Sequence, residues 1–357
     1  MGIMKIYNMG IIGFGGMAGH HYNQCKKFGR INVRGIYDIN PERGEYAKSI
    51  GLISYSSADE LISDPEIDIV LVATTNDTHK EYVLKALAAD KSVICEKPAT
   101  IYSKDLEEMI EAAKSSKGVF TIDQNRRVNK DFVLMRRQVE SGIIGKPYVF
   151  ESRVEGSRGM PAGWRQTKAQ GGGMMLDWGV HLIDQMMYMY QELKVVNVFC
   201  KMFSVHYPEV DDNFRLTMTF DNGIVAHIEV STNNFINHPR WYVLGTEGTL
   251  QIDGWDCEGK VVKCLEREDT WGVDIKKTKA GPSKTMAPRS EDTVEVIKLE
   301  APTDVEDNLN PVYIQLIDAI EGRAELTIKP EQALRVIKVM EAAFLSSETE
   351  NAVKTCI

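Results

Sequence analysis

The sequence lacks the cysteine spacings that close disulfides or hold metal ions. No Cys-x-x-Cys pair occurs among its six cysteines, which are Cys25, Cys95, Cys200, Cys257, Cys264 and Cys356. Paired cysteines are typical of oxidising compartments, and isolated thiols are typical of reducing ones. This pattern excludes a disulfide-built scaffold and predicts reduced thiols, a cytoplasmic protein and no bound metal.

Long apolar runs and positive net charge are also absent. No segment approaches the roughly 20 apolar residues of a membrane span, and the first residues do not resemble a secretion signal. With 42 basic and 51 acidic residues, the formal net charge is -9. These features predict no membrane partner and no nucleic-acid partner.

The length of the chain indicates more than one core. Single cores usually stop growing at about 250 to 300 residues, and this chain has 357. We therefore expect two domains, with residues 1–124 in the first and residues 125–357 in the second.

A glycine-rich turn follows the first apolar run and predicts a dinucleotide site. The residues after Lys5 to Ile12 fit the pattern G-x-G-x-x-A, and they are Gly13, Phe14, Gly15, Gly16, Met17 and Ala18. Glycines in such a turn let backbone amides approach a pyrophosphate at a helix N-terminus. A second apolar run ends at Asp38, whose carboxylate would bind a ribose and repel a 2′-phosphate. This favours NAD, with NADP less favoured; a capping role for Asp38 before Pro41 is the alternative.

Strands and helices then alternate along the first domain. Ile67 to Val72 is an unbroken apolar run, as in strands buried on both faces of a parallel sheet. Helical spacing from Thr78 to Ala89 and a further strand from Lys91 to Cys95 follow. Repeated units of this kind predict an α/β fold with a doubly wound parallel sheet of the Rossmann type, whose ligand lies at the carboxyl ends of the strands.

Two of these strand ends carry polar side chains. Thr74, Thr75, Asn76 and His79 follow the first strand, and Glu96-Lys97-Pro98 follows the next. A lysine between a buried strand and a proline is held in place, so its ammonium could hydrogen-bond a substrate hydroxyl. A surface ion pair between Glu96 and Lys97 is the alternative, but the position of both at the cofactor crevice favours the functional interpretation.

A stretch with three ionisable side chains follows three glycines, Gly171 to Gly173. If the segment is helical, Asp177, His181 and Asp184 lie on one face. A histidine flanked by carboxylates can exchange protons near neutral pH, because its unperturbed pKa is near 6.5. Proton transfer and metal binding are both compatible with this face, and the absence of zinc motifs favours proton transfer. Asp184 has the weaker case and is interpreted as support.

The second domain has strand character over most of its middle. The runs with this character are Val195 to Phe203, Asn213 to Phe220, Ile224 to Asn233, Trp241 to Gly245, Thr249 to Ile252 and Lys260 to Leu265. They predict an α+β domain with a large, open, mostly antiparallel sheet. A polar excursion is expected from Lys276 to Asp292, and helices within 311–346 can pack back on the first domain.

The motifs in this order resemble the glucose-fructose oxidoreductase/inositol dehydrogenase (Gfo/Idh/MocA) family. The resemblance implies that Lys97, Asp177 and His181 are catalytic and that Glu96, Asn125, Trp164 and Arg165 join the cofactor site. It also implies a substrate site and a homo-oligomer, a dimer or tetramer formed through the open sheet. We expect the substrate-binding residues to be Lys97, Arg127, Arg153, Trp164, Asp177 and His181.

The activity that this resemblance implies is NAD-dependent oxidation or reduction of a secondary ring hydroxyl. The substrate would be a cyclic polyol, a sugar or a glycoside, with the scyllo-inositol dehydrogenase branch the most similar. NAD-assisted glycoside cleavage through transient sugar oxidation and a non-enzymatic NAD-responsive regulator are the alternatives. The ring, its carbon and the direction of reaction stay open.

Overall fold

The computed structural model describes residues 5–266, 275–283, 289, 291–306 and 308–357. Its first sheet has six parallel strands in the order β3-β2-β1-β4-β5-β6. The strands are β1 (Tyr7–Ile12), β2 (Ile31–Tyr37), β3 (Ile53–Ser54), β4 (Ile69–Val72), β5 (Ser92–Cys95) and β6 (Phe120–Ile122). Every residue of β4 and β5 is buried, as their unbroken apolar sequences predict. The doubly wound parallel sheet is therefore confirmed.

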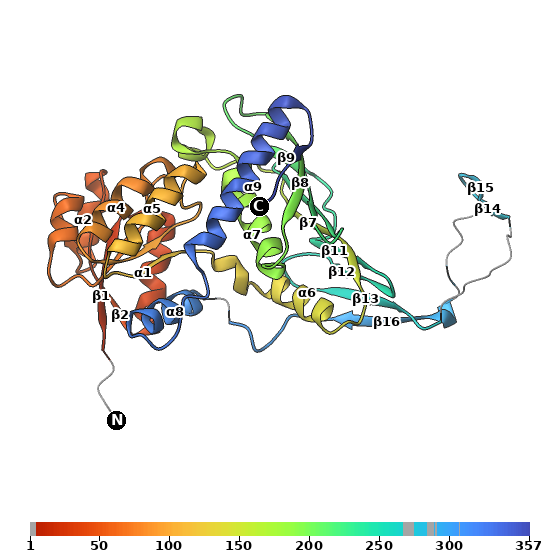
Figure 1. Ribbon diagram of the computed structural model, residues 1–357, viewed down its shortest axis with the longest axis horizontal. Helices are drawn as coiled ribbons and strands as arrows, with labels where there is room; N and C mark the ends of the chain where they lie inside the picture. The colour runs from red at the N-terminus through yellow and green to blue at the C-terminus, as the bar shows by residue number, and fades with distance from the viewer. Residues whose placement is uncertain (1–4, 267–274, 284–288, 290, 307) are drawn as a thin grey trace.

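Helices lie on both faces of this sheet (Figure 1). They are α1 (Gly16–Phe28), α2 (Pro41–Ser49), α3 (Ala58–Ser63), α4 (His79–Ala88) and α5 (Ser103–Ser115). The chain order within the sheet reverses at β1 and β4, so the carboxyl ends of these two strands border a crevice. The glycine turn after β1 opens into that crevice.

The second sheet has nine strands in the order β16-β13-β12-β11-β7-β10-β9-β8-β17. Their bounds are β7 (Pro147–Glu155), β8 (Val195–Phe203), β9 (Asn213–Phe220), β10 (Val225–Ser231), β11 (Trp241–Gly245), β12 (Gly248–Ile252), β13 (Gly259–Cys264), β16 (Val294–Leu299) and β17 (Val353–Lys354). Only β7 and β10 pair in parallel among these neighbours; the other pairs are antiparallel. The large, mostly antiparallel sheet is confirmed, and β16 is an edge strand that the sequence pattern had not indicated.

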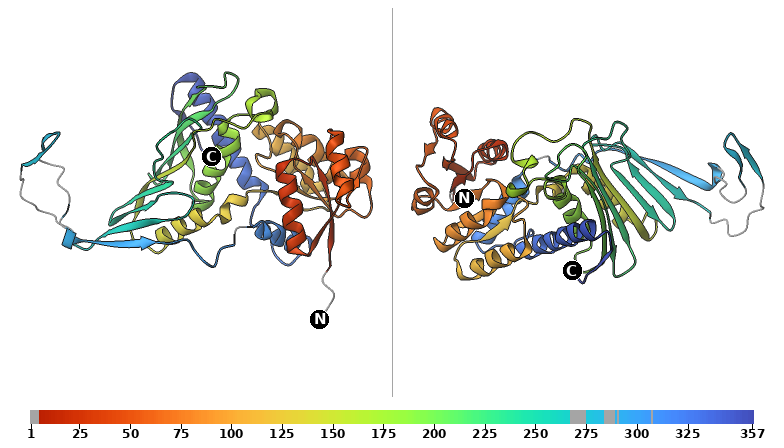
Figure 2. Two further views of the ribbon diagram at one scale, coloured as in Figure 1. Left: turned by 180° about the vertical axis from the view of Figure 1, so that it is seen from behind. Right: turned by 90° about the horizontal axis from the view of Figure 1, so that it is seen from above.

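One face of the second sheet is covered by helices and the other is open (Figures 1 and 2). The covering helices are α6 (Lys130–Glu140), α7 (Val180–Met189) and α9 (Pro330–Thr349). Strand β9 shows the two faces in its alternation, because Phe214, Leu216 and Met218 are buried and the residues between them are more exposed. Phe199 on β8 lies on the open face, in register with Thr217 of β9.

The C-terminal helices connect the two sheets. Helix α8 (Asn310–Ile320) packs Tyr313, Leu316 and Ile317 into the core that contains Tyr7 and Met9 of β1. Helix α9 contacts α5 beside the first sheet and β8 in the second. The described part of the chain has no helix with the length and apolar character of a membrane span.

Short helices and one hairpin complete the fold. The 3-10 turns are η1 (Asn76–Thr78), η2 (Asn125–Val128), η3 (Trp164–Gln166), η4 (Lys168–Gln170) and η6 (Glu291–Thr293). The expected polar excursion contains the two-stranded hairpin of β14 (Lys276–Thr278) and β15 (Gly281–Ser283). Its residues 284–288 and 290 lie outside the described part of the chain.

Candidate active site

The glycine turn after β1 forms one wall of a groove of about 530 Å³ at the carboxyl edge of the first sheet. Gly13 has φ +85°, and a Cβ there would lie 2.7 Å from the backbone oxygen of Ala73, so only glycine fits. Nothing lies within 4 Å of a Cβ built on Gly15 or Gly16, which leaves their backbone open to the groove. Helix α1 starts at Gly16, and its N-terminus suits a pyrophosphate. The residues present therefore fit a dinucleotide.

Asp38 fastens the glycine turn to the end of β2. Its Oδ2 accepts a hydrogen bond of 2.6 Å from the Phe14 backbone N–H, and its Oδ1 accepts one of 2.8 Å from that of Asn40. The carboxylate also lines the groove. Asp38 thus has the turn-capping contacts of the alternative interpretation and the groove position of the cofactor interpretation together.

Most of the other residues expected at the cofactor border the same groove. They include Met17, Thr74, Thr75, Asn76, Glu96, Lys97, Trp164 and Arg165. Ala18 and Phe14 are buried beneath the turn, where Phe14 stacks on Tyr46. His79 is also buried, with its ring nitrogens 3.0 Å from the Pro98 backbone oxygen and 3.2 Å from that of Thr74. The structure therefore gives His79 contacts that hold two strand-end loops together.

Lys97 reaches from the end of β5 to the segment that precedes α7. Its Nζ donates to the Asp177 backbone oxygen at 2.9 Å and lies 3.1 Å from Asp177 Oδ1. Arg165 donates from Nε to the other carboxylate oxygen of Asp177 at 3.0 Å. Although burial works in the opposite direction, Lys97 and Arg165 hold the pKa of Asp177 below its usual value. Asp177 is therefore ionised and held between two cations.

The segment with Asp177 and His181 is not one regular α-helix. Residues Met175–Gly179 form a π-helix, and α7 continues from Val180. A π-helical turn closes i→i+5 hydrogen bonds and so changes the directions in which its side chains project, and the expected single face is wrong for Asp184. Both oxygens of Asp184 accept hydrogen bonds from the buried guanidinium of Arg127, at 2.6 and 2.8 Å. Asp184 supports the fold and does not face the candidate site.

His181 is a buried imidazole among positive charges. Burial lowers its pKa well below 6.5, and Lys97, Arg126 and Arg240 lower it further. Its Nδ1 is buried and has no hydrogen-bond partner in the described part of the chain. The ring is neutral near pH 7 and can accept a proton, whereas the sequence had suggested a histidine between two carboxylates.

The three glycines before this segment permit a close approach of backbone. A Cβ on Gly172 would lie 2.4 Å from the Arg165 backbone oxygen, and one on Gly173 would lie 2.3 Å from Asp211 Oδ1. The carboxylate of Asp211 accepts a 2.7 Å hydrogen bond from the Met175 backbone N–H. The glycines thereby fix the π-helix against the turn that carries Trp164 and Arg165.

A second cavity, of about 840 Å³, lies between the two sheets and meets the groove at Met17, Lys97 and Arg165. His181, Asp177 and Asn125 also line it. An aromatic wall is formed by Trp178 and Trp255, whose ring centres are 5.8 Å apart. The guanidinium of Arg126 lies 4.1 Å from the Trp178 ring centre. Sequence patterns gave no signal for Trp255, because its loop joins the site only through the fold.

Three residues expected at the substrate lie elsewhere. Arg127 is buried in its pair with Asp184, and its neighbour Arg126 lines the cavity instead. Arg153 forms ion pairs with Glu151 and Glu229 on the open side of the second sheet. Trp164 borders the dinucleotide groove, with its ring centre 4.5 Å from the Arg165 guanidinium. Each of the three side chains points away from the second cavity, and the local sequence does not predict the direction of a side chain.

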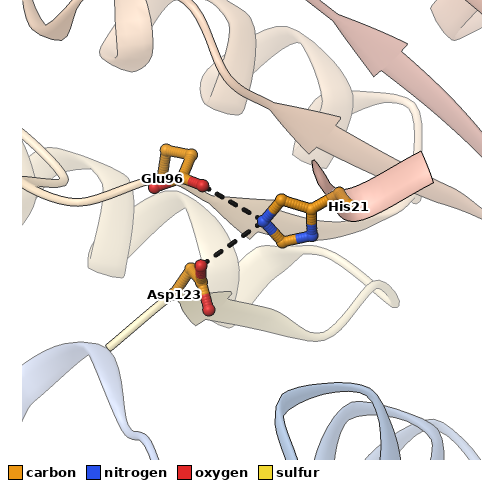
Figure 3. A group of neighbouring side chains, drawn as sticks. All are labelled: His21, Glu96 and Asp123. Atoms are coloured by element: carbon orange, nitrogen blue, oxygen red, sulfur yellow. Dashed lines mark hydrogen bonds and ion pairs between the residues drawn. The ribbon is translucent and has the colours of Figure 1, made fainter. Parts of the chain in front are cut away.

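A buried histidine that sequence patterns did not single out lies beside Glu96, the residue before Lys97. His21 of α1 has its Nε2 3.1 Å from Glu96 Oε1 and 3.4 Å from Asp123 Oδ2 (Figure 3). Its other ring nitrogen is 2.8 Å from the Tyr313 hydroxyl of α8. His21 belongs to no sequence motif, so nothing local indicated its burial or its two acidic neighbours.

A dinucleotide groove meets a second cavity at Lys97, and the neutral His181 lines that cavity; these are the features of an oxidoreductase with a dinucleotide-binding domain. The family model for oxidoreductases with an NAD-binding Rossmann fold matches residues 7–124, and the GFO/IDH/MocA C-terminal domain model matches residues 132–251. The chain belongs to the Gfo/Idh/MocA family.

Individual relatives agree with this assignment. An uncharacterized oxidoreductase of Schizosaccharomyces pombe is 30% identical over 315 residues, which cover 85% of each protein. A scyllo-inositol 2-dehydrogenase (NADP(+)) of Bacillus subtilis is 25% identical over 83% of this chain and 81% of its own. An NAD-binding protein from Listeria innocua has a similar crystal structure, with a TM-score of 0.87, 39% identity, and coverage of 98% of this chain and 97% of that one.

Proposed function

We propose that this protein transfers a hydride between a nicotinamide cofactor and a ring carbon that bears a secondary hydroxyl. The substrate class is a cyclic polyol, a sugar or a glycoside. The observation that carries the proposal is the position of Lys97, which lines both the dinucleotide groove and the second cavity, where His181 also lies. The similarity to a scyllo-inositol 2-dehydrogenase supports the substrate class.

The ammonium of Lys97 is suited to hold the reacting oxygen. It has three N–H donors, and two of them have acceptors on Asp177. The third can donate to the substrate hydroxyl and stabilise negative charge that develops on that oxygen during oxidation. Asp177 and Arg165 keep the ammonium in place, so Asp177 acts in catalysis by orienting Lys97.

His181 is suited to take the hydroxyl proton. It is neutral near pH 7 and lines the second cavity, where the substrate would lie. General bases of this kind contribute about 10²- to 10⁴-fold to a rate. Bound nicotinamide would supply the hydride acceptor or donor. The cations around His181 also favour release of the proton once the imidazole has accepted it.

The preferred cofactor in this proposal is NAD. Asp38 ends β2 at the groove, and a carboxylate there would accept hydrogen bonds from ribose hydroxyls and repel a 2′-phosphate. Its contact with the Phe14 N–H fixes it at the turn where the ribose would lie. This preference differs from that of the NADP(+)-dependent relative.

We also propose that the protein is a homo-oligomer and lies in the cytoplasm. The proposed boundary between its two domains is near residue 124. The open face of the nine-stranded sheet exposes apolar side chains that include Phe199, Phe203 and Val296. Exposed apolar patches of this kind suit a second copy of the chain. All six cysteines are free, which suits a reducing compartment.

A substrate screen tests the function. Purified protein is assayed for NADH and NADPH formation with inositols, aldoses and glycosides, beside the variant Lys97→Met. We expect turnover with NAD on at least one ring polyol, and a fall of about 10³-fold in kcat for Lys97→Met with NADH binding retained. Equal use of NAD and NADP would contradict the role of Asp38. Release of free sugar without net NADH would favour NAD-assisted glycoside cleavage, and NAD binding with no turnover would favour a regulator.

A further inference from the structure

The buried group of His21, Glu96 and Asp123 joins three parts of the first domain. His21 comes from α1, Glu96 follows β5 and Asp123 follows β6 (Figure 3). Their side chains are 0%, 6% and 0% exposed. The Tyr313 hydroxyl brings α8 to the same imidazole. Four segments that are distant in the sequence therefore meet at one ring.

Each partner of His21 is attached to a wall of the candidate active site. Glu96 Oε2 accepts a 3.2 Å hydrogen bond from the Lys97 backbone N–H. Asp123 Oδ2 accepts one of 2.9 Å from the side-chain amide of Asn125. Lys97 and Asn125 both line the second cavity. His21 itself lies in the second turn of the helix whose N-terminus faces the dinucleotide groove.

A positively charged imidazole, with a proton on Nε2, explains why two buried carboxylates can lie so close together. Two buried carboxylates this close repel each other unless a positive charge lies between them. Burial lowers the pKa of His21, but hydrogen bonds and charges from Asp123 and Glu96 outweigh it and raise the pKa to about 9. Tyr313 is the other titratable group at the ring, Cys25 contacts Tyr313 in turn, and burial raises the pKa of Tyr313, Cys25 and Asp123. The imidazole is therefore the cation of the group at neutral pH.

A metal ion is the competing explanation. The ligand atoms of the three residues lie within 4.8 Å of one another, which is close enough for one ion. Structural zinc takes four ligands and magnesium takes six, most of the latter from water. His21 and Asp123 are fully buried and Glu96 is only 6% exposed, which leaves little room for the waters that would complete such a shell. The hydrogen-bonding distances from Nε2 favour the proton.

We propose that His21 is a positioning residue whose imidazolium holds Glu96 and Asp123 together, and so keeps the dinucleotide helix aligned with Lys97 and Asn125. Loss of one proton leaves a neutral ring that no longer offsets the charges of the two carboxylates, and their repulsion pushes α1 away from the ends of β5 and β6. The dinucleotide groove and the second cavity then lose their alignment together. The proposal rests on the proposed function, although its test reads cofactor binding and needs no substrate.

The experiment compares His21→Gln with His20→Gln, the same change one residue earlier at an exposed position of α1. NADH affinity is measured by fluorescence at pH values of about 7.5 and 10, on either side of the His21 pKa. We expect wild type and His20→Gln to bind about tenfold more weakly at the higher pH. His21→Gln should bind at both pH values as weakly as wild type does at high pH, since glutamine carries no charge to lose.

Several outcomes would overturn the proposal. Wild-type affinity in His21→Gln at both pH values is one, and one equivalent of metal in the dialysed protein by mass spectrometry is another. If circular dichroism shows that His21→Gln does not fold, the pH dependence of wild-type NADH affinity still tests the proposal. A wild-type affinity that does not change with pH would contradict it. In Lys97→Met the alkaline weakening must persist, or Lys97 is its source. If the substrate screen finds no turnover, these NADH-binding results can still be interpreted.

Discussion

The proton of His181 is controlled by side chains from distant parts of the chain. Burial lowers its pKa well below 6.5, with Lys97, Arg126 and Arg240 adding to the shift. For oxidation, kcat/KM should therefore be insensitive to this group above pH 6.5 and should fall only below it, where the base becomes protonated. His181→Gln should lower kcat by about 10²- to 10⁴-fold and remove the acid limb. Steady-state kinetics from acid to neutral pH measure both.

A matched control for this variant is His227→Gln. His227 lies on the open face of the second sheet, where its ring contacts Thr217. This variant should keep the wild-type profile. An acid limb that is centred above pH 6.5 in wild type, or that persists in His181→Gln, would contradict the assignment.

At the scale of single residues, the sequence predicted which residues line the candidate site better than it predicted which side chains they contact. Lys97, Asp177 and His181 were expected from motifs, and the structure brings all three to one cavity. Asp177 was expected beside the imidazole, yet its carboxylate contacts Lys97 and Arg165. Lys97 and Asp177 are 80 residues apart, so their pairing depends on how the end of β5 packs against the segment that precedes α7. No local sequence pattern contains that information.

The triple-glycine turn controls the placement of the helix that carries His181. The φ of Gly172 lies outside the left-handed region, so the need for glycine comes from contact alone: a Cβ would lie 2.4 Å from the Arg165 oxygen and 2.8 Å from that of Trp164. We expect Gly172→Ala to lower the free energy of unfolding by about 1–3 kcal/mol. It should also lower kcat by displacing Arg165 from Asp177. Chemical denaturation and kinetics measure the two effects.

Gly19→Ala is the control at the level of the element. Gly19 lies within α1 with nothing within 4 Å of a built Cβ. Alanine in a helix is favoured over glycine by up to about 1 kcal/mol, so this variant should keep or gain stability. Equal stability of Gly172→Ala and wild type would show that the turn can relax.

Local sequence patterns predicted which strands and helices exist, but they did not predict the geometry of each. The six strand runs expected between residues 195 and 265 appear as β8 to β13. The π-helix at Met175–Gly179 was not expected, because an i, i+4 pattern does not distinguish it from a regular helix. Its insertion depends on Asp211 and on the backbone of Arg165, which contact the glycines from elsewhere in the fold.

The whole molecule leaves one sheet face uncovered, and the proposed oligomer would cover it. Phe199 is 46% exposed on that face, in β8, the strand next to the short edge strand β17. Phe199→Glu would place a charge in the interface, which is costly to bury without a partner. We expect this variant to shift the protein to a smaller species in size-exclusion chromatography with light scattering, and Ile314→Glu to have no effect. Ile314 is 47% exposed on α8, away from the sheet. A monomeric wild type would refute the oligomer.

The sequence by itself determined the two sheets, the dinucleotide turn and the residue types at the candidate site. Strand periodicity, glycine position and the Glu-Lys-Pro motif are local features, and local backbone chemistry carries them through folding. The tertiary structure alone decided charge state and partnership. It surrounded His181 with cations, buried Arg127 against Asp184 and gave His21 two carboxylates. These outcomes depend on burial and on long-range packing, because an ionisable group takes its proton from its three-dimensional surroundings.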